Sequence, residues 1–146
     1  MRDPGSVQLL HVEDDELCLM GLHRAFKAAK LPNSIVFAHD GIHALEMLRG
    51  TNGRVRLASP FVILLDLKMP RMGGIEFLVE LRRDKDLKKS VVFVLTTSAT
   101  EEDKAKSYNL GVAGYILKTN PANAFAEATA LLDTYWRVVE LPALNR

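Results

Sequence analysis

The chain is poor in cysteine and has no long apolar segment, and both absences limit what it can be. Its single cysteine, Cys18, cannot form a disulfide within the chain, which favours a reducing compartment. The first residues are too polar for a signal peptide, and no apolar run reaches the length of a membrane span. We therefore expect a cytoplasmic protein with no membrane partner.

An excess of charge of either sign is also missing. The 146 residues carry a net charge of +1, so the sequence offers no strongly basic face for nucleic acid, and we expect no nucleic-acid partner. Hydrophobic residues make up 48% and charged residues 25%, which is the balance of a folded globular protein. The length suits one domain over residues 1–146, with its core at about 7–134 and a C-terminal extension at 135–146.

What the sequence does contain is an alternation of short apolar clusters and longer amphipathic stretches. The clusters are typical of buried strands, and the stretches are typical of helices. Strands are predicted at residues 7–12, 35–37, 61–65, 91–95 and 115–117. Helices are predicted from residue 16 to about 30, from 41, from about 74 to 84, from 101 to about 110, and from 121. This order predicts an α/β fold, a doubly wound five-stranded parallel sheet flanked by five helices.

One of these helices has a recognisable start. Thr100 is followed three residues later by Asp103, which resembles a capping box in which Asp replaces the usual Glu. Gly111 can end the same helix.

Polar residues follow four of the five predicted strands. Ligands of doubly wound sheets bind just beyond the carboxyl ends of the strands, so these residues are candidates for a site. They are Glu13, Asp14 and Asp15 after the first strand, Asp66 after the third, Thr96, Thr97 and Ser98 after the fourth, and Lys118 after the fifth. Each group alone has an ordinary explanation in helix capping, turns or solvation. Their convergence on one edge, in order, indicates a shared site.

The chemistry of this set is coherent. Clustered carboxylates repel one another unless a hard cation joins them, and Mg²⁺ takes one or two carboxylates with backbone oxygen, water and phosphate. An aspartate can attack phosphorus and form an acyl phosphate. Asp66 is the strongest candidate because it ends an entirely apolar strand, where an unpaired carboxylate is costly. Lys118, Thr96 and the metal would supply positive charge and donors to the phosphoryl oxygens.

The ordered motifs resemble those of bacterial two-component response-regulator receiver domains, and the similarity covers nearly the whole chain. It rests on Val12-Glu13-Asp14-Asp15, Leu64-Leu65-Asp66-Leu67-Lys68-Met69-Pro70, Leu95-Thr96 and Gly114-Tyr115-Ile116-Leu117-Lys118. Three features resemble, more narrowly, those of small stand-alone receivers coupled to bacterial phytochromes. They are the long loop before the third strand, the Leu95-Thr96-Thr97-Ser98 run and the tail at 135–142. The resemblance implies the flavodoxin-like receiver fold.

The same resemblance implies an acceptor and a set of metal ligands. Asp66 would be the phosphoacceptor. Asp14 and Asp66 would bind Mg²⁺ directly, Glu13 would act through water, and Lys68 would offer its backbone carbonyl.

It also implies a switch. Lys118 would pair with the acceptor and then with the phosphoryl group, Thr96 would turn toward the phosphate, and Tyr115 would move into the space that Thr96 leaves.

Three positions depart from the receiver pattern. Thr119 follows Lys118 where receivers usually carry a cis proline, and Gly73 stands where Asp is common. Lys68 places a cationic side chain beside the site, where a neutral one is more common.

A receiver of this kind is a signalling module rather than an enzyme, because it catalyses only its own phosphorylation and dephosphorylation. The implied phosphodonor is a sensor histidine kinase, with a bacteriophytochrome as one candidate, and the output is binding to a downstream protein of unknown identity. Two alternatives stay open. An aspartyl-phosphate phosphatase would need a second acid where Lys68 stands, and a degenerate receiver that serves only as a scaffold would not need Asp14, Asp66, Thr96 and Lys118 together.

The remaining polar candidates are expected to be structural. His11, His23, His39 and His43 show no ligand-like pairing, so packing or solvated roles are expected for them. Cys18 lies between two leucines and is expected to be a small buried side chain.

The tail is rich in large apolar side chains. Tyr135, Trp136, Val138, Val139 and Leu141 are more than one short amphipathic turn can bury beneath itself, and exposed aromatic patches usually mark interfaces. Together with the resemblance to phytochrome-coupled receivers, this predicts a symmetric homodimer through the last strand and the last helix. The alternative is that the tail folds back over its own sheet edge.

Overall fold

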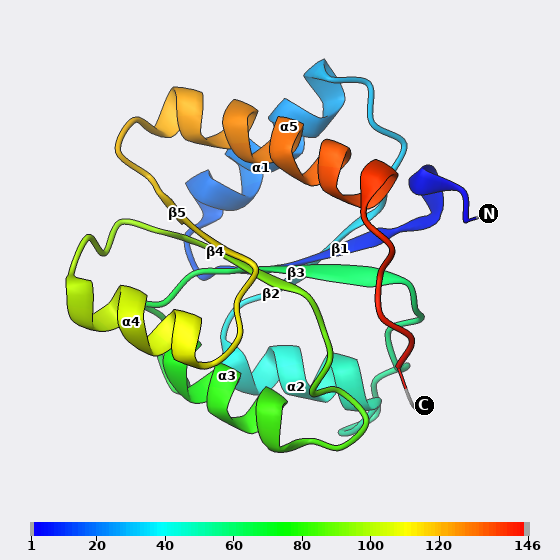
Figure 1. Ribbon diagram of the computed structural model, residues 1–146, viewed down its shortest axis with the longest axis vertical. Helices are drawn as coiled ribbons and strands as arrows, with labels where there is room; N and C mark the ends of the chain where they lie inside the picture. The colour runs from blue at the N-terminus through cyan, green and yellow to red at the C-terminus, as the bar shows by residue number, and fades with distance from the viewer. Residues whose placement is uncertain (1, 145–146) are drawn as a thin grey trace.

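A single parallel sheet forms the centre of the molecule (Figure 1). The computed structural model describes residues 2–144. The strands are β1 (Gln8–Val12), β2 (Ile35–Ala38), β3 (Phe61–Leu65), β4 (Val92–Thr96) and β5 (Gly114–Leu117). Their order across the sheet is β2-β1-β3-β4-β5, with every pair parallel. The predicted doubly wound α/β fold is confirmed.

Helices cover both faces of this sheet. One face carries α1 (Glu16–Ala28) and α5 (Pro121–Val138), and the other carries α2 (Gly41–Arg49), α3 (Gly74–Arg83) and α4 (Glu101–Asn109). A short 3₁₀ turn, η1 (Pro4–Ser6), precedes β1. Because helices lie on both sides, β3 and β4 are buried at every position, which explains why β3 is entirely apolar and β4 is apolar up to Thr96.

The direction of the chain reverses between β1 and β3. From β1 the chain moves outward to β2 and then returns to the other side of β1, so the connections after β1 and β3 leave the sheet on opposite faces. This divergence opens the crevice in which such sheets bind ligands. Val12 lies opposite Leu65 in the register, so Glu13 and Asp66, the next residues of the two segments, begin at the same level.

The apolar core is divided in two by the sheet. The cluster on the α2 and α3 side includes Ile63, Phe77 and Leu81, and the cluster on the α1 and α5 side includes Leu22, Phe26 and Phe125. The helices α1 and α5 approach closely because α1 carries a glycine at the contact.

A Cβ on Gly21 would lie 2.5 Å from the Phe125 ring, so a larger residue there would push the two helices apart.

One helix has almost no share in this core. The sequence of α4 is mostly polar, and Ser107 is the only residue of α4 that is buried. Its position on the sheet must therefore depend on hydrogen bonds more than on apolar packing.

The tail folds back onto its own domain, so the expectation of an exposed aromatic tail is wrong. Trp136 is only 1% exposed and packs edge-on against Phe26, with 6.1 Å between the ring centroids. Tyr135 meets Phe93 in the same way at 4.9 Å. The physical reason is that α5 reaches Val138, so the apolar stripe of the helix continues onto the sheet through what was expected to be an extension.

Hydrogen bonds connect the N-terminal segment to the C-terminal tail. The Arg2 guanidinium donates to the carbonyl oxygens of Trp136 and Val139, at 3.0 and 3.4 Å. Further along, Leu141 packs against one core cluster and Leu144 against the other. Residues 145 and 146 of the expected extension lie outside the described residues. No helix in the described part of the chain combines the length and the apolar character that crossing a membrane requires.

Replacing Trp136 by alanine tests whether the tail belongs to the core. We expect Trp136→Ala to lower the free energy of unfolding by about 3–5 kcal/mol, because a large buried ring leaves a cavity. Val138, which is 75% exposed in the same turn, is the matched control, and Val138→Ala should change stability by no more than about 0.5 kcal/mol. Urea denaturation of both variants measures the difference, and equal stabilities would contradict the packing described.

Candidate phosphoacceptor and metal site

Three carboxylates meet at the carboxyl edge of the sheet, as the sequence predicts. Glu13, Asp14 and Asp66 each offer one oxygen atom, and these atoms all lie within 4.8 Å of one another. Glu13 and Asp66 are buried, at 1% and 9% exposure, whereas Asp14 is exposed to solvent. The site is therefore a mostly buried acidic pair with one carboxylate open to the outside.

Asp66 is held firmly by the backbone around it. Its amide donates to the carbonyl of Val12 on β1 at 3.0 Å, and its Oδ1 accepts from the amide of Leu67 at 2.8 Å. A Cβ on Gly74 would lie 2.5 Å from the carbonyl oxygen of Asp66, so the start of α3 can approach Asp66 only because residue 74 is glycine. Gly73 occupies the N-cap position of α3 and provides no side-chain cap.

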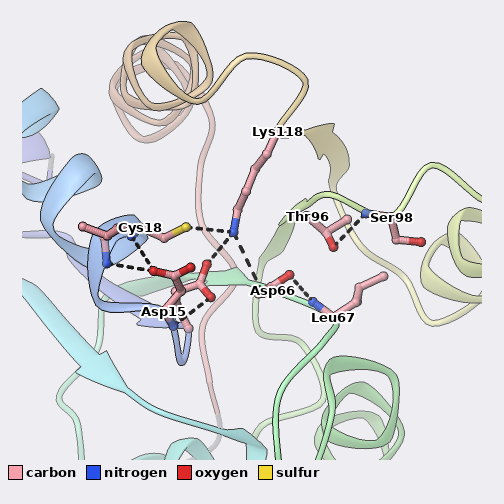
Figure 2. A network of polar contacts seen from close by, with 9 residues as sticks. Asp15, Cys18, Asp66, Leu67, Thr96, Ser98 and Lys118 are labelled. Carbon is pink, nitrogen blue, oxygen red and sulfur yellow. Dashed lines mark hydrogen bonds and ion pairs between the residues drawn. The ribbon is translucent and has the colours of Figure 1, made fainter.

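Lys118 places a cation among these carboxylates (Figure 2). Its Nζ lies 2.6 Å from Oε1 of Glu13 and 3.9 Å from Oδ2 of Asp66, and it also donates to the Cys18 sulfur at 3.4 Å. The side chain of Lys118 is only 6% exposed. In the described residues the only cis peptide bond precedes Pro60, so the Lys118–Thr119 bond is trans and the loop adopts this geometry without the proline that receivers usually carry.

Burial and charge act against each other in this pair. Burial disfavours the ammonium of Lys118, but its hydrogen bond to Glu13 and the charges of Glu13 and Asp66 outweigh that effect and keep the pKa of Lys118 above its ordinary value. Burial raises the pKa of Glu13; the hydrogen bond from Lys118 opposes this rise and the neighbouring charge of Asp66 adds to it. Lys118 is therefore the permanent positive charge that the buried carboxylates share.

Two residues near this cation were not predicted to be part of the site. His11 is 1% exposed, and burial, together with the charge of Lys118, lowers its pKa to about 3, so the imidazole is neutral. Cys18 is partly rather than fully buried, and burial raises the pKa of its thiol. The alternation of side chains along β1 could have revealed His11, because residues 11 and 13 point to the same side of the strand.

The fourth strand brings its hydroxyls to the neighbouring position. Thr96 is fully buried, and its Oγ1 accepts from the amide of Ser98 at 3.3 Å. Tyr115 donates its hydroxyl to the carbonyl of Ser98 at 2.8 Å. Figure 2 shows Thr96 beside Asp66, as expected from the pairing of β3 with β4, and Ser98 beyond Thr96. The predicted switch residues Thr96 and Tyr115 are thus joined through one residue, Ser98.

The loop after Asp66 is fixed by two contacts with the start of α2. Arg71 lies 2.7 Å from Oδ2 of Asp40, and the Met72 carbonyl accepts from the amide of Gly41 at 3.0 Å. Both partners stand at the start of α2, so the loop that carries Lys68 is anchored to a neighbouring helix. Lys68 itself is exposed, and the metal-ligand role of its carbonyl stays a prediction.

The residues present fit a divalent cation. Every potential ligand in the cluster is a carboxylate oxygen, which suits hard ions such as Mg²⁺ or Mn²⁺ better than metals that prefer sulfur or imidazole. Asp14 is open to solvent and can receive an ion together with its remaining waters. One lysine stands among the three carboxylates of the cluster, so the group has negative charge to spare for a cation.

A family comparison agrees with this geometry. The model of the response regulator receiver domain family matches residues 9–130. The chain belongs to this family. It is therefore a signalling receiver, and neither alternative drawn from the sequence is favoured by the match.

Individual similar proteins indicate which kind of receiver this chain resembles. Response regulator Rcp1 from Synechocystis is 32% identical over 142 residues, covering 97% of this chain and 96% of the relative. The crystal structure of the phosphorylated cyanobacterial phytochrome response regulator RcpA is 31% identical with a TM-score of 0.85, covering 94% of this chain and 99% of that one. The Mn²⁺-bound form of Rcp1 has a TM-score of 0.84 at 31% identity, with the same coverage. The resemblance to phytochrome response regulators is confirmed.

Removing the exposed carboxylate tests the metal site. We expect Asp14→Ala to weaken binding of Mg²⁺ or Mn²⁺ by about tenfold or more, because it deletes an oxygen ligand of the ion. Asp15→Asn is the control: it removes an adjacent charge that lies outside the cluster, and the amide can still cap α1 as Asp15 does. Calorimetric titration measures both affinities, and equal metal binding by the two variants would place the ion elsewhere.

Proposed function

We propose that the protein receives a phosphoryl group on Asp66 from a sensor histidine kinase of the phytochrome class, with Mg²⁺ bound, and passes the change to a downstream protein. The observation that carries this proposal is the position of Asp66. It ends the central strand, beside two further carboxylates and 3.9 Å from a buried lysine. Similarity to a phytochrome response regulator supports the choice of kinase.

The transfer forms one bond and breaks another. A carboxylate oxygen of Asp66 attacks phosphorus, an O–P bond forms, and the P–N bond of the donor phosphohistidine breaks with its electron pair passing to the imidazole nitrogen. Asp14 and Asp66 would hold Mg²⁺ directly, Glu13 through water, and Lys68 through its carbonyl. When bound, the ion would neutralise charge on the carboxylates and the phosphoryl oxygens.

The chain's own cation and hydroxyl complete the site. Lys118 lies between Glu13 and Asp66, so a short movement takes its ammonium from the carboxylate pair to a phosphoryl oxygen. The Thr96 hydroxyl accepts from Ser98 and keeps its own proton available for donation. We infer that Thr96 turns toward the phosphoryl group and that Tyr115 follows, which makes the pair the output switch.

Replacing the acceptor by its amide tests the assignment. We expect Asp66→Asn to gain no phosphate from acetyl phosphate and Mg²⁺, because the amide has nearly the same shape but is a poor nucleophile. The fold should persist, which circular dichroism checks. Asp15→Asn, a neighbouring aspartate outside the carboxylate cluster, should gain phosphate as the wild type does. Intact mass spectrometry measures the gain, and phosphate uptake by Asp66→Asn would rule out this acceptor.

We also infer that the whole chain acts as one domain and pairs with a second copy through β5 and α5. With Trp136 packed inward, the large apolar side chains that stay exposed on β5 and on the described part of α5 are Leu117, at 36% on the edge strand, Leu131, at 42%, and Val138, at 75%. An edge strand with an apolar side chain is a common place for association.

Charged substitutions test this pairing better than truncation, which would remove the buried Trp136. We expect Leu117→Glu and Leu131→Glu to convert a dimer into a monomer, because like charges would then face each other across a two-fold axis. Leu17→Glu, on the exposed side of α1, is the control. Light scattering at tens of micromolar measures the mass; a monomeric wild type would contradict the proposal.

A further inference from the structure

The helix α4 is attached to the domain by polar contacts at its two ends. Ser107 is its only buried residue, and its surface ion pairs, Glu101 with Lys104 and Glu102 with Lys106, stay within the helix. These pairs cannot hold α4 against the sheet. Its position therefore depends on the few hydrogen bonds that connect its first and last turns to other segments.

The last turn is held by a partly buried guanidinium. Arg82 on α3 donates to the carbonyl oxygens of Leu110 and Gly111, which follow α4, at 2.7 and 3.1 Å. The same side chain donates to the carbonyls of Lys88 and Ser90 at 2.6 and 2.8 Å. All four acceptors are backbone atoms of two adjoining loops, so this end of α4 is a fixed point.

The first turn is held by Asp103. Thr100 caps the helix by accepting from the amide of Asp103 at 3.2 Å, which is half of the predicted capping box. The Asp103 carboxylate, however, accepts a hydrogen bond from the Ser98 hydroxyl at 2.5 Å. Asp103 thereby connects α4 to the loop that follows β4, and its partner Ser98 is only 4% exposed.

Ser98 is also the residue that contacts both parts of the proposed switch. Its amide donates to the Thr96 hydroxyl, and its carbonyl accepts from the Tyr115 hydroxyl. A rotation of Thr96 toward Asp66 removes the acceptor of the Ser98 amide and changes the loop at this point. The side chain of Ser98 is then the shortest polar route from that change to α4.

We propose that Asp103 transmits the movement of Thr96 to α4, through its hydrogen bond to Ser98. The inference rests on the proposed function, since it takes Asp66 as the acceptor and Thr96 as the responding hydroxyl. As Ser98 shifts, its hydroxyl draws the carboxylate of Asp103 and with it the first turn of α4. Arg82 holds the other end, so α4 turns about its C-terminal end. Asp103 is a positioning residue and contacts no reacting atom.

Nuclear magnetic resonance of backbone amides tests this link, with beryllofluoride and Mg²⁺ as the phosphoryl mimic. The amide of Leu67, which donates to Asp66, reports occupancy of the acceptor, and the amides of Glu101 to Asp103 report the first turn of α4. In the wild type we expect both groups of signals to shift. In Ser98→Ala and Asp103→Ala we expect the Leu67 shift to persist while the α4 equilibrium moves about tenfold less, the effect of losing one charge-assisted hydrogen bond.

Two variants separate transmission from mere stability. Asp103→Asn keeps an oxygen that accepts from Ser98, so the α4 response should remain close to that of the wild type. Glu102→Ala removes a surface pair in the same turn, and the response should be unchanged. A full α4 response in both Ser98→Ala and Asp103→Ala overturns the link. So does a wild type in which Leu67 responds and α4 does not, whereas a silent Leu67 overturns the proposed function itself.

Discussion

The carboxyl edge of this sheet depends on the ammonium of Lys118. It lies where the segments after β1, β3 and β5 meet, and it compensates Glu13 and Asp66 in surroundings from which water is largely excluded. Removing one partner of a buried ion pair typically costs about 3–5 kcal/mol, because the remaining charge has no compensation. Lys118 therefore links the segments that follow three strands and can also contact a second anion, so one charge contributes both to the stability of this edge and to its chemistry.

The rest of the fold follows from the covering of the sheet on both faces. The central strands are apolar up to their carboxyl ends, where Thr96 ends β4 and Asp66 follows β3, and this places the reactive groups at one edge. Helices α1, α2, α3 and α5 contribute apolar side chains to the core. The exception is α4, whose polar sequence leaves it held by hydrogen bonds at its ends. A helix attached in this way can change position without opening the core.

The sequence predicted the fold and the convergence of the site because both follow from order along the chain. Alternation of strands and helices determines the edge at which Glu13, Asp66, Thr96 and Lys118 meet, and no tertiary detail is needed. The tail was predicted wrongly, because periodicity does not reveal that α5 continues to Val138 and directs Trp136 into the core.

The polar contacts around the proposed switch residues could not be predicted from the sequence either. A capping-box pattern indicates that Asp103 begins a helix, and half of that box is present. Whether its carboxylate turns back to the cap or outward to Ser98 depends on where the loop after β4 lies, which is a tertiary property. The burial of His11 beside Lys118 depends in the same way on the loop after β5.

Arg2 and the tail lie against the edge at which the strands begin, near Phe61 and Val91, and the acidic cluster lies at the opposite edge. The first and last described residues therefore lie across the sheet from Asp66, the proposed acceptor. A protein that approaches the acidic edge meets neither of them, so the surface that meets a phosphodonor would be separate from the surface that carries the described ends of the chain.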